Sequence, residues 1–193
     1  KRFDGVAAGR LPRPLRAFRL GAALLDRGIQ VPRAWLAVAG KDGVGFVVSE
    51  QVPGQDLYRF SAGGRGGSYA RLEPRSRHLL LEALGRFLRG MHDEEIRHRD
   101  LKALNLVVAT DPLRFWITDL DGARLARGPI PLGRRARDLA RLDASLDATR
   151  ADRLRVLDAY LRVHPRIEAD KRTFLDTVAR HVAQKRGPSG RPH

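Results

Sequence analysis

One predicted β-hairpin constrains the fold of this chain more than any other feature. The polar sequence HRDLKALN leads into the apolar segment NLVVA (105–109), and a second apolar segment, RFWITDL (114–120), follows after a turn at Asp111-Pro112. Two short apolar segments separated by such a turn are typical of antiparallel strands joined as a hairpin. The sequence therefore predicts a hairpin whose open end is flanked by polar groups on both strands.

The open end of this hairpin brings together groups that suit phosphoryl transfer. Asp100, in the bend before the first strand, can hold an acceptor hydroxyl, and Lys102 can lean towards the transferring phosphate. Asn105 starts the first strand and Asp119 ends the second, so the hairpin places two hard oxygen ligands together, as Mg²⁺ requires. Each residue alone is more often a turn or cap residue, so the predicted site rests on their order and strand context.

The segments before this hairpin predict a helix, another hairpin and a connector. Residues 11–28 place apolar side chains at helical spacing, with prolines at the entry and Gly28 at the end. AWLAVAG and VGFVVSE, separated by Asp42-Gly43, predict a hairpin, and residues 51–57 predict a connector. The glycine-rich residues 61–68 lack the full G-x-G-x-x-G pattern, so we expect a surface loop there and not a phosphate-binding loop.

The remaining segments predict a mainly helical second part. A long helix begins at Pro74, two or three helices follow residue 134, and we expect the tail GPSGRPH to be disordered. Apolar residues recur along one stripe of the long helix and alternate along the strand at 114–120. The expected core residues are Leu80, Leu84, Phe87, Leu88 and Met91 in the helix, and Leu113, Phe115 and Ile117 on one face of the strand. This order of elements indicates an α+β fold, with a small strand-bearing part before a larger helical part.

The charge of the chain leaves two interpretations open. The formal net charge is +15, from 37 basic and 22 acidic residues, and arginine accounts for most of the excess. One interpretation is a compositional bias towards arginine; the other is an anionic partner such as acidic lipid, a phosphorylated sugar or nucleic acid. Arginine is scattered through every segment and aromatic residues make up only 6%, which argues against a surface that stacks nucleic-acid bases. Cysteine is absent, which excludes disulfides and thiolate zinc sites.

The order of polar residues around the hairpin resembles that of the protein-kinase-like superfamily. His98-Arg99-Asp100 and Asn105 match H-R-D-x-x-x-x-N, and Asp119-Leu120-Asp121 stands in place of D-F-G. Within the superfamily, the closest resemblance is to the bacterial lipopolysaccharide kinases that phosphorylate Kdo or heptose of the inner core. ITDLDGARL is similar to the metal loop of that family, RDLARLDASL to the helix that replaces an A-P-E segment, and FVVSEQVPGQDL to the fifth strand and hinge.

This resemblance covers nearly all of residues 1–165 and implies an α+β, protein-kinase-like two-lobe fold with a truncated N-lobe and a mostly helical C-lobe. The partial N-lobe would occupy 1–50 and contain the end of the third strand, a C-type helix and two strands. A hinge would follow over 51–56. The C-lobe, with the catalytic and metal loops, would occupy 57–185, before a disordered tail over 186–193.

The resemblance also implies roles for individual residues in the reaction. Asp100 would be the catalytic aspartate and Lys102 the cation on the phosphate side. Asn105 and Asp119 would bind Mg²⁺, with Asp121 as the alternative ligand. The neighbouring His98 and Arg99 would brace the loop.

The nucleotide would contact two other regions of the chain. Glu50 to Pro53, including Val52, would form the hinge whose main chain binds adenine, and Lys1 would be the third-strand lysine that pairs with the α- and β-phosphates. Two features depart from the family pattern. Lys1 stands at the chain terminus, so the first two strands and their glycine loop would lie upstream. The helix over 11–28 has no glutamate to pair with this lysine, since Asp26 is in its last turn.

These implications lead to a functional expectation with named alternatives. We expect an ATP- and Mg²⁺-dependent phosphotransferase that acts on a sugar hydroxyl of the lipopolysaccharide inner core, Kdo or heptose, or of a similar glycan. We expect a lipid-linked acceptor, a cytoplasmic location at the inner face of the inner membrane, contact with its anionic surface, and no nucleic-acid partner. A serine/threonine protein kinase is one alternative, although the A-P-E segment is missing, and a nucleotide-binding pseudokinase is another. The sequence carries no signal for an oligomeric state.

Overall fold

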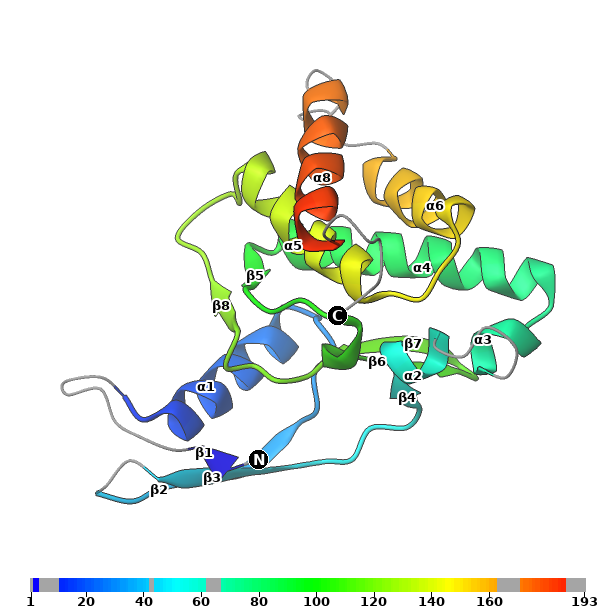
Figure 1. Cartoon of the computed structure of the whole chain (residues 1–193). Coiled ribbons are helices and arrows are strands. Elements are labelled where there is room, and N and C mark those ends of the chain that lie inside the picture. The colour runs from blue at the N-terminus through cyan, green and yellow to red at the C-terminus, as the bar shows by residue number, and fades with distance from the viewer. Residues whose placement is uncertain (1, 4–10, 42–43, 62–66, 163–170, 187–193) are drawn as a thin grey trace.

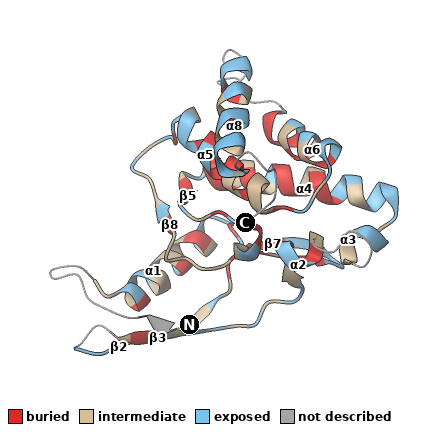
Figure 2. Ribbon diagram, viewed as in Figure 1, coloured by how far each residue is buried: buried red, intermediate tan, exposed pale blue. Residues whose placement is uncertain are grey.

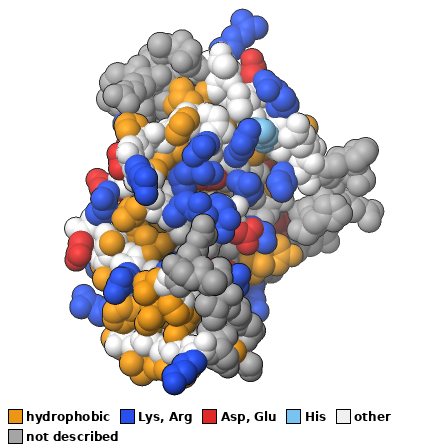
Figure 3. Space-filling model, turned by 90° about the vertical axis from the view of Figure 1, so that its left-hand side faces the viewer, with side chains coloured by type: hydrophobic (Ala, Val, Ile, Leu, Met, Phe, Trp, Pro, Cys, Tyr) orange, Lys and Arg blue, Asp and Glu red, His pale blue; other side chains and the backbone are white. Residues whose placement is uncertain are grey.

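The computed structural model describes residues 2–3, 11–41, 44–61, 67–162 and 171–186. A small antiparallel sheet with one helix lies at one end of the molecule, and a group of longer helices lies at the other (Figure 1). A β-hairpin lies between them. No helix within the described ranges is long and apolar enough to cross a membrane. Lys and Arg side chains gather over the middle of the face shown in Figure 3.

The small sheet consists of β1 (Arg2–Phe3), β3 (Gly45–Ser49) and β2 (Ala34–Ala39), in that spatial order. Both of its strand pairs are antiparallel. Helix α1 (Arg13–Asp26) packs on this sheet and begins with a proline in its first turn, where the missing N–H costs no helical hydrogen bond. The predicted helix and hairpin are therefore confirmed, while the predicted turn at Asp42-Gly43 lies outside the described residues.

The predicted connector at 51–57 contains regular structure that the sequence did not reveal. Strand β4 (Gln55–Asp56) pairs with the later hairpin, and helix α2 (Leu57–Ser61) follows directly. Gly54 permits this pairing because its φ is +103° and a Cβ there would meet the carbonyl oxygen of Val108 at 2.1 Å. Most of the glycine-rich segment lies outside the described residues, and helix α3 (Ser68–Arg71) begins at its end.

The long helix α4 (Pro74–Asp93) follows the predicted amphipathic pattern. Leu80, Leu84, Leu88 and Met91 are at most 2% exposed and form one side of the core. Phe87 is only partly buried. Its ring packs against the ring of Phe115, with 5.6 Å between the ring centroids. The stripe is therefore buried in the core, as predicted, apart from the partly buried Phe87.

Two short strands that the sequence did not predict lie next to the polar loop. Strand β5 (Ile96–His98) pairs antiparallel with β8 (Ala123–Leu125). The sequence carries no strand signal here, because charged residues surround Ile96 and mask any alternation. The pairing joins residues 25 to 29 positions apart, so it depends on tertiary contacts that no local pattern encodes.

The predicted central hairpin is confirmed as β6 (Leu106–Thr110) and β7 (Leu113–Ile117), preceded by a 3₁₀ turn, η1 (Ala103–Asn105). The Asp111-Pro112 peptide bond in its turn is cis. Phe115 and Ile117 are buried, as expected, but Leu113 is 36% exposed, so that part of the prediction is wrong. Leu113 pairs with Thr110 at the closed end of the hairpin, beyond the reach of the core.

Within the described residues after β8, the chain forms three more helices: α5 (Leu132–Ser145), α6 (Arg150–Leu161) and α8 (Lys171–Arg186). Helix α5 packs against α8, and α4 packs against α6. Buried residues concentrate where these helices meet (Figure 2). A cavity of about 630 Å³ lies between α5, α6 and α8, and none of the residues that line it belongs to the central hairpin or its flanking loops. The predicted tail after residue 186 lies outside the described residues.

Candidate active site

The bend before β6 places Asp100 at the centre of the candidate site. Asp100 and Lys102 are both about half exposed, and Nζ of Lys102 lies 2.9 Å from Oδ2 of Asp100. The side chain of Asn105 closes the bend, because its Nδ2 donates a hydrogen bond of 2.7 Å to the carbonyl oxygen of Asp100. Three of the residues named from the sequence therefore lie within one turn of the chain.

The hairpin brings Asn105 and Asp119 to the same end of the sheet. The N–H of Thr118 donates to the carbonyl oxygen of Asn105 at 2.9 Å, so the residue before Asp119 is bonded directly to Asn105. Strand β7 ends at Ile117, two residues earlier than predicted. Asp119 then adopts a left-handed backbone conformation with φ of +53°, which Asp tolerates better than most residues. Its carbonyl oxygen accepts a hydrogen bond from Gly122, which forms a tight turn.

Buried His98 ties this turn to the bend. Its Nε2 lies 3.2 Å from the carbonyl oxygens of both Thr118 and Asp119. Both partners only accept, so Nε2 carries the proton and donates. Burial lowers the pKa of His98, which keeps the ring neutral. The imidazole thus holds the backbone of Asp119 against the strand that leads to Asp100.

Helix α1 contacts the Asp119 turn at two points. A carboxylate oxygen of Asp121 lies 3.6 Å from the guanidinium of Arg16, and both side chains are partly exposed. A Cβ on Gly21 would lie 3.3 Å from the side chain of Leu120, so the helix and the turn are closely packed. Asp121, the alternative metal ligand, is therefore engaged with a cation on α1.

The expected hinge residues lie on the chain between β3 and β4. Glu50 is bonded to Arg33 twice: its N–H donates to the carbonyl oxygen of Arg33, and its Oε1 accepts from the N–H of Arg33, each at 2.9 Å. Val52 is partly buried. Because Gly54 packs on β6, this segment runs next to the strand that follows Asn105. Lys1 lies outside the described residues.

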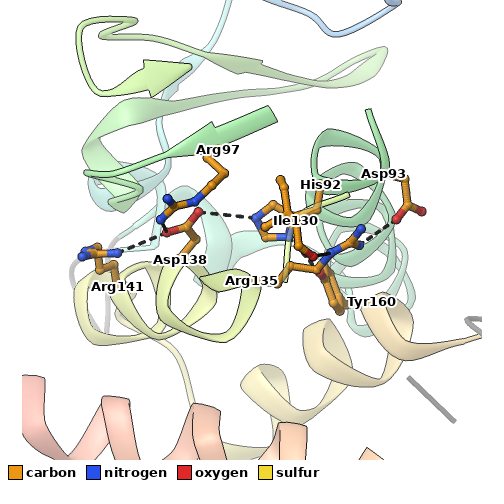
Figure 4. A network of polar contacts seen from close by, with 8 residues as sticks. All are labelled: His92, Asp93, Arg97, Ile130, Arg135, Asp138, Arg141 and Tyr160. Atoms are coloured by element: carbon orange, nitrogen blue, oxygen red, sulfur yellow. Dashed lines mark hydrogen bonds and ion pairs between the residues drawn. The ribbon is translucent and has the colours of Figure 1, made fainter. Parts of the chain in front are cut away.

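A buried carboxylate, Asp138 of α5, holds the strand that leads to the bend (Figure 4). Its Oδ1 lies 3.1 Å from Arg141 and 3.6 Å from Arg97 of β5, and its Oδ2 lies 3.7 Å from Nε2 of His92. Buried carboxylates persist in proteins when cations compensate them. Asp138 thereby joins α4, α5 and β5. Its partner on β5, Arg97, lies three residues before Asp100.

The second half of this network joins α4, α5 and α6. Nδ1 of His92 lies 2.7 Å from the hydroxyl of Tyr160, and Arg135 donates to Asp93 at 2.7 Å and to the carbonyl oxygen of Ile130 at 3.1 Å (Figure 4). Partial burial opposes ionisation of Asp93, but hydrogen bonds from Arg135 and Arg89 lower its pKa overall. The loop that bears Asp100 therefore rests on a scaffold of several helices.

The sequence interpretation missed this supporting network. Asp138 lies within RDLARLDASL, and Arg135, Asp138 and Leu142 share one side of a helix at spacings of three and four. A carboxylate in the same stripe as buried leucines was the available signal. Ser145 was missed as well; its hydroxyl accepts a 2.8 Å hydrogen bond from the N–H of Ala103 and holds η1 against α5.

The side chains at this site suit a cation that takes only some of its ligands from the protein and the others from phosphate oxygens and water. Among the described residues, no group of three or more His, Cys, Asp and Glu side chains could hold a metal ion. Asn105 donates through Nδ2, which leaves its hard carbonyl oxygen, and Asp119 adds a carboxylate on the adjacent turn. Mg²⁺ is usually bound by one or two such groups and completes its shell with phosphate oxygens and water. The residues present fit this ion.

Comparison with protein families gives one match that spans most of the chain. The model of the lipopolysaccharide kinase (Kdo/WaaP) family matches residues 9–160. This range includes Asp100, Lys102, Asn105 and Asp119, and it ends in α6.

Two curated relatives are similar to the chain over shorter ranges. The 3-deoxy-D-manno-octulosonic acid kinase of Vibrio cholerae is 33% identical over 113 residues, which cover 56% of this chain and 43% of the relative. The lipopolysaccharide core heptose(I) kinase WaaP of Pseudomonas aeruginosa is 33% identical over 127 residues, which cover 61% of this chain and 46% of the relative. The chain thus spans less than half the length of these relatives.

A solved structure of WaaP in complex with acyl carrier protein has the same fold. It superposes with a TM-score of 0.65 and 27% sequence identity, and the match covers 88% of this chain and 74% of that chain. The expected α+β, kinase-like fold is therefore confirmed.

Proposed function

Because the chain belongs to the lipopolysaccharide kinase (Kdo/WaaP) family, we propose that it transfers phosphate from ATP to a sugar hydroxyl of the lipopolysaccharide inner core. The single observation that supports this best is the joint placement of Asp100, Asn105 and Asp119 at the open end of one hairpin. Asn105 is bonded to the backbone of Asp100 on one side and to the residue before Asp119 on the other. The acceptor would be Kdo or heptose on a lipid-linked glycan.

In this proposal Asp100 accepts a hydrogen bond from the acceptor hydroxyl and orients its oxygen. Lys102, 2.9 Å from the same carboxylate, would place a positive charge beside the entering phosphate. Hydrogen bonds from Asn105 and to Ser145 fix the bend. Asp100 and Lys102 would therefore not have to reorganise when substrate binds. Positioning and fixed charge supply most of the rate in phosphoryl transfer.

Asn105 and Asp119 would hold the magnesium ion of the nucleotide. When bound, the ion neutralises charge on the phosphates and aligns them with the acceptor. His98 would hold Asp119 in its left-handed conformation and so aim its carboxylate. Adenine would lie against the hinge at Glu50 to Pro53, including Val52, and Lys1 would meet the α- and β-phosphates.

The division into lobes follows from the same proposal. Residues 1–50 would belong to the N-lobe, 51–56 to the hinge and 57–185 to the C-lobe. The fold supports this division, because the hinge segment separates the β1–β3–β2 sheet from the helical part. We also propose that the enzyme works at the cytoplasmic face of the inner membrane, where its lipid-linked acceptor would be found.

A nucleotide-binding protein without transfer activity is the second candidate. One observation favours it: α1 contacts the metal turn through a cation, Arg16, which lies 3.6 Å from Asp121, and not through a carboxylate that could pair with the phosphate-binding lysine. Asp26, at the end of α1, is the only acidic residue of that helix. Binding of ATP with Mg²⁺ but no transfer to any acceptor would support this candidate.

Substitution of Asp100 tests the proposed activity. Asp100→Asn should reduce transfer to purified lipid A–core acceptor by about 10²- to 10⁴-fold, because the acceptor hydroxyl loses its oriented base. Binding of ATP, measured by calorimetry, should remain. Asp111→Asn, an exposed carboxylate at the hairpin turn, is the matched control and should leave transfer unchanged. Equal turnover of Asp100→Asn and the unsubstituted protein would remove Asp100 from its role.

A further inference from the structure

One face of the small sheet carries large apolar side chains that the rest of the described protein leaves exposed. We call Leu36, Val38, Phe46 and Val48 the sheet face. Their exposed fractions are 49%, 40%, 45% and 40%. Single exposed leucines are common on protein surfaces, but a contiguous apolar group marks an interaction site.

Strand pairing shows that these side chains form one continuous group. Leu36 lies directly opposite Val48, and Val38 lies directly opposite Phe46. Directly opposed residues of an antiparallel pair point to the same side, and residues two apart on one strand do the same. The sheet face is therefore a two-by-two block on β2 and β3.

Helix α1 covers the opposite side of the sheet. A Cβ on Gly45 would lie 2.7 Å from the ring of Pro14, so Gly45 points towards α1. Val47, two residues on, shares that side and is paired with Ala37. Phe46 and Val48 consequently point away from the only helix that packs on this sheet among the described residues.

Trp35 extends the apolar surface at the edge of the sheet. The register shifts between Ala34 and Leu36, so Trp35 is the extra residue of a β-bulge, and it is 64% exposed. Bulges re-aim a side chain at sheet edges. An exposed indole beside aliphatic residues is the arrangement favoured at a membrane–water interface.

Among the described residues, the charges at the two ends of β2 are mainly positive. Exposed Arg33 and Lys41 flank β2 at its two ends, while Glu50 holds its carboxylate against the N–H of Arg33. In Figure 3, orange side chains form a broad area over the end that contains α1, β2 and β3, with Lys and Arg among them. With a net charge of +15, two copies of the chain would repel one another on close approach. An anionic surface would instead attract the positively charged protein.

We propose that the sheet face docks on an anionic phospholipid bilayer. Leu36, Val38, Phe46 and Val48 enter the headgroup region, Trp35 sits at its boundary, and Arg33 and Lys41 pair with lipid phosphates. This inference rests on the proposed function in one respect, namely that the acceptor is lipid-linked. Docking through the sheet would hold the hairpin and Asp100 at the membrane surface while leaving them accessible.

Binding to vesicles without any acceptor tests the docking separately from phosphate transfer. The protein should co-sediment with vesicles of phosphatidylcholine that contain about 30 mol% phosphatidylglycerol, and at least about tenfold less with pure phosphatidylcholine. Val38→Thr/Phe46→Thr removes one apolar pair but keeps side chains that favour strands, and should weaken binding about tenfold. Leu79→Gln/Leu113→Thr removes similarly exposed apolar residues elsewhere and should bind normally.

Charge variants test the electrostatic part. Arg33→Gln/Lys41→Gln should lower binding to the anionic vesicles about three- to tenfold. Arg71→Gln/Arg75→Gln removes the same charge from exposed positions on α3 and α4 and should have a smaller effect. Circular dichroism and thermal unfolding of each variant establish that the fold is retained.

Tryptophan fluorescence locates the contact directly. The chain has two tryptophans, and Trp116 is only 5% exposed, so Trp116→Phe leaves Trp35 as the sole emitter. Its emission should shift to shorter wavelength with anionic vesicles and become protected from aqueous quenchers.

An unshifted emission from vesicle-bound protein would overturn the proposal, as would full vesicle binding by Val38→Thr/Phe46→Thr. A concentration-dependent dimer lost in that variant, without vesicle binding, would assign the face to a second copy of the chain instead. None of these results depends on whether the protein transfers phosphate.

Discussion

Burial sets the protonation of His92, which lies at the centre of the supporting network. The ring is fully buried, and burial lowers its pKa more than the nearby carboxylate of Asp138 raises it. Tyr160 contacts one ring nitrogen, and Arg135 and Asp93 lie close by. A neutral His92 in a network of charged groups makes stability depend on pH.

The free energy of unfolding should fall as the pH is lowered below about 6.5, the ordinary pKa of histidine. Above that pH the His92 ring is neutral in both states and contributes no pH dependence. Below that pH, His92 is protonated in the unfolded chain but stays neutral in the folded protein. The free energy of unfolding therefore falls by up to about 1.4 kcal/mol per pH unit until the lowered pKa is reached. Urea unfolding at pH 7, 6 and 5 measures this slope.

His92→Gln should remove that contribution, because glutamine does not titrate. His78→Gln, on the exposed side of the same helix, is the control and should retain the slope. If His92→Gln lost stability between pH 7 and pH 5 as steeply as the unsubstituted protein, His92 would not be the titrating group.

Helices α4 and α6 approach so closely that one position tolerates only glycine. A Cβ on Gly85 would meet the carbonyl oxygen of Val156 at 2.4 Å and the Cβ of Ala159 at 2.7 Å. Both contacts involve groups on a packed helix that cannot rotate away. Gly85 thus sets the distance between α4 and α6, and Tyr160, which contacts His92, lies on α6.

Gly85→Ala should destabilise the protein by about 1–3 kcal/mol, because the added methyl group forces the helices apart. Gly90→Ala on the same helix provides the control, since nothing lies within 4 Å of its added Cβ. That substitution should stabilise the protein by about 0.5–1 kcal/mol through helix propensity. Urea denaturation of both variants measures the difference, and equal effects would mean that α4 and α6 are not in close contact.

The excess of arginine affects the molecule as a whole. Many arginines are paired, as Arg97, Arg135 and Arg141 are, but the formal charge of +15 remains after all acidic residues are counted. A compact state with this charge repels itself, and salt screens the repulsion over about 10 Å at 0.1 M.

Salt should therefore raise the melting temperature by about 2–6 °C between roughly 20 mM and 300 mM NaCl. Calorimetry or circular dichroism at constant pH measures the change. A melting temperature that fell with salt would mean that the surface ion pairs outweigh the net repulsion. Vesicle binding should respond in the opposite direction and weaken with salt.

The elements with strong local patterns could be predicted from the sequence. Helices α1 and α4 follow an apolar spacing of three and four residues, and the β6–β7 hairpin follows two apolar segments joined by a turn. The order of Asp100, Asn105 and Asp119 along this hairpin indicated a site, and the structure brings these residues together at its open end. Their catalytic and metal-binding roles stay predictions.

Other features depend on residues that are distant in the chain and meet only in the folded protein. Ile96 becomes a strand residue only because Leu125 lies opposite, Leu113 is exposed because the core ends before it, and Asp138 is buried because Arg97, Arg141 and His92 surround it. The sheet face is exposed because α1 packs on the other side of the strands. Periodicity reports which side of an element is apolar, and only tertiary packing decides what covers that side.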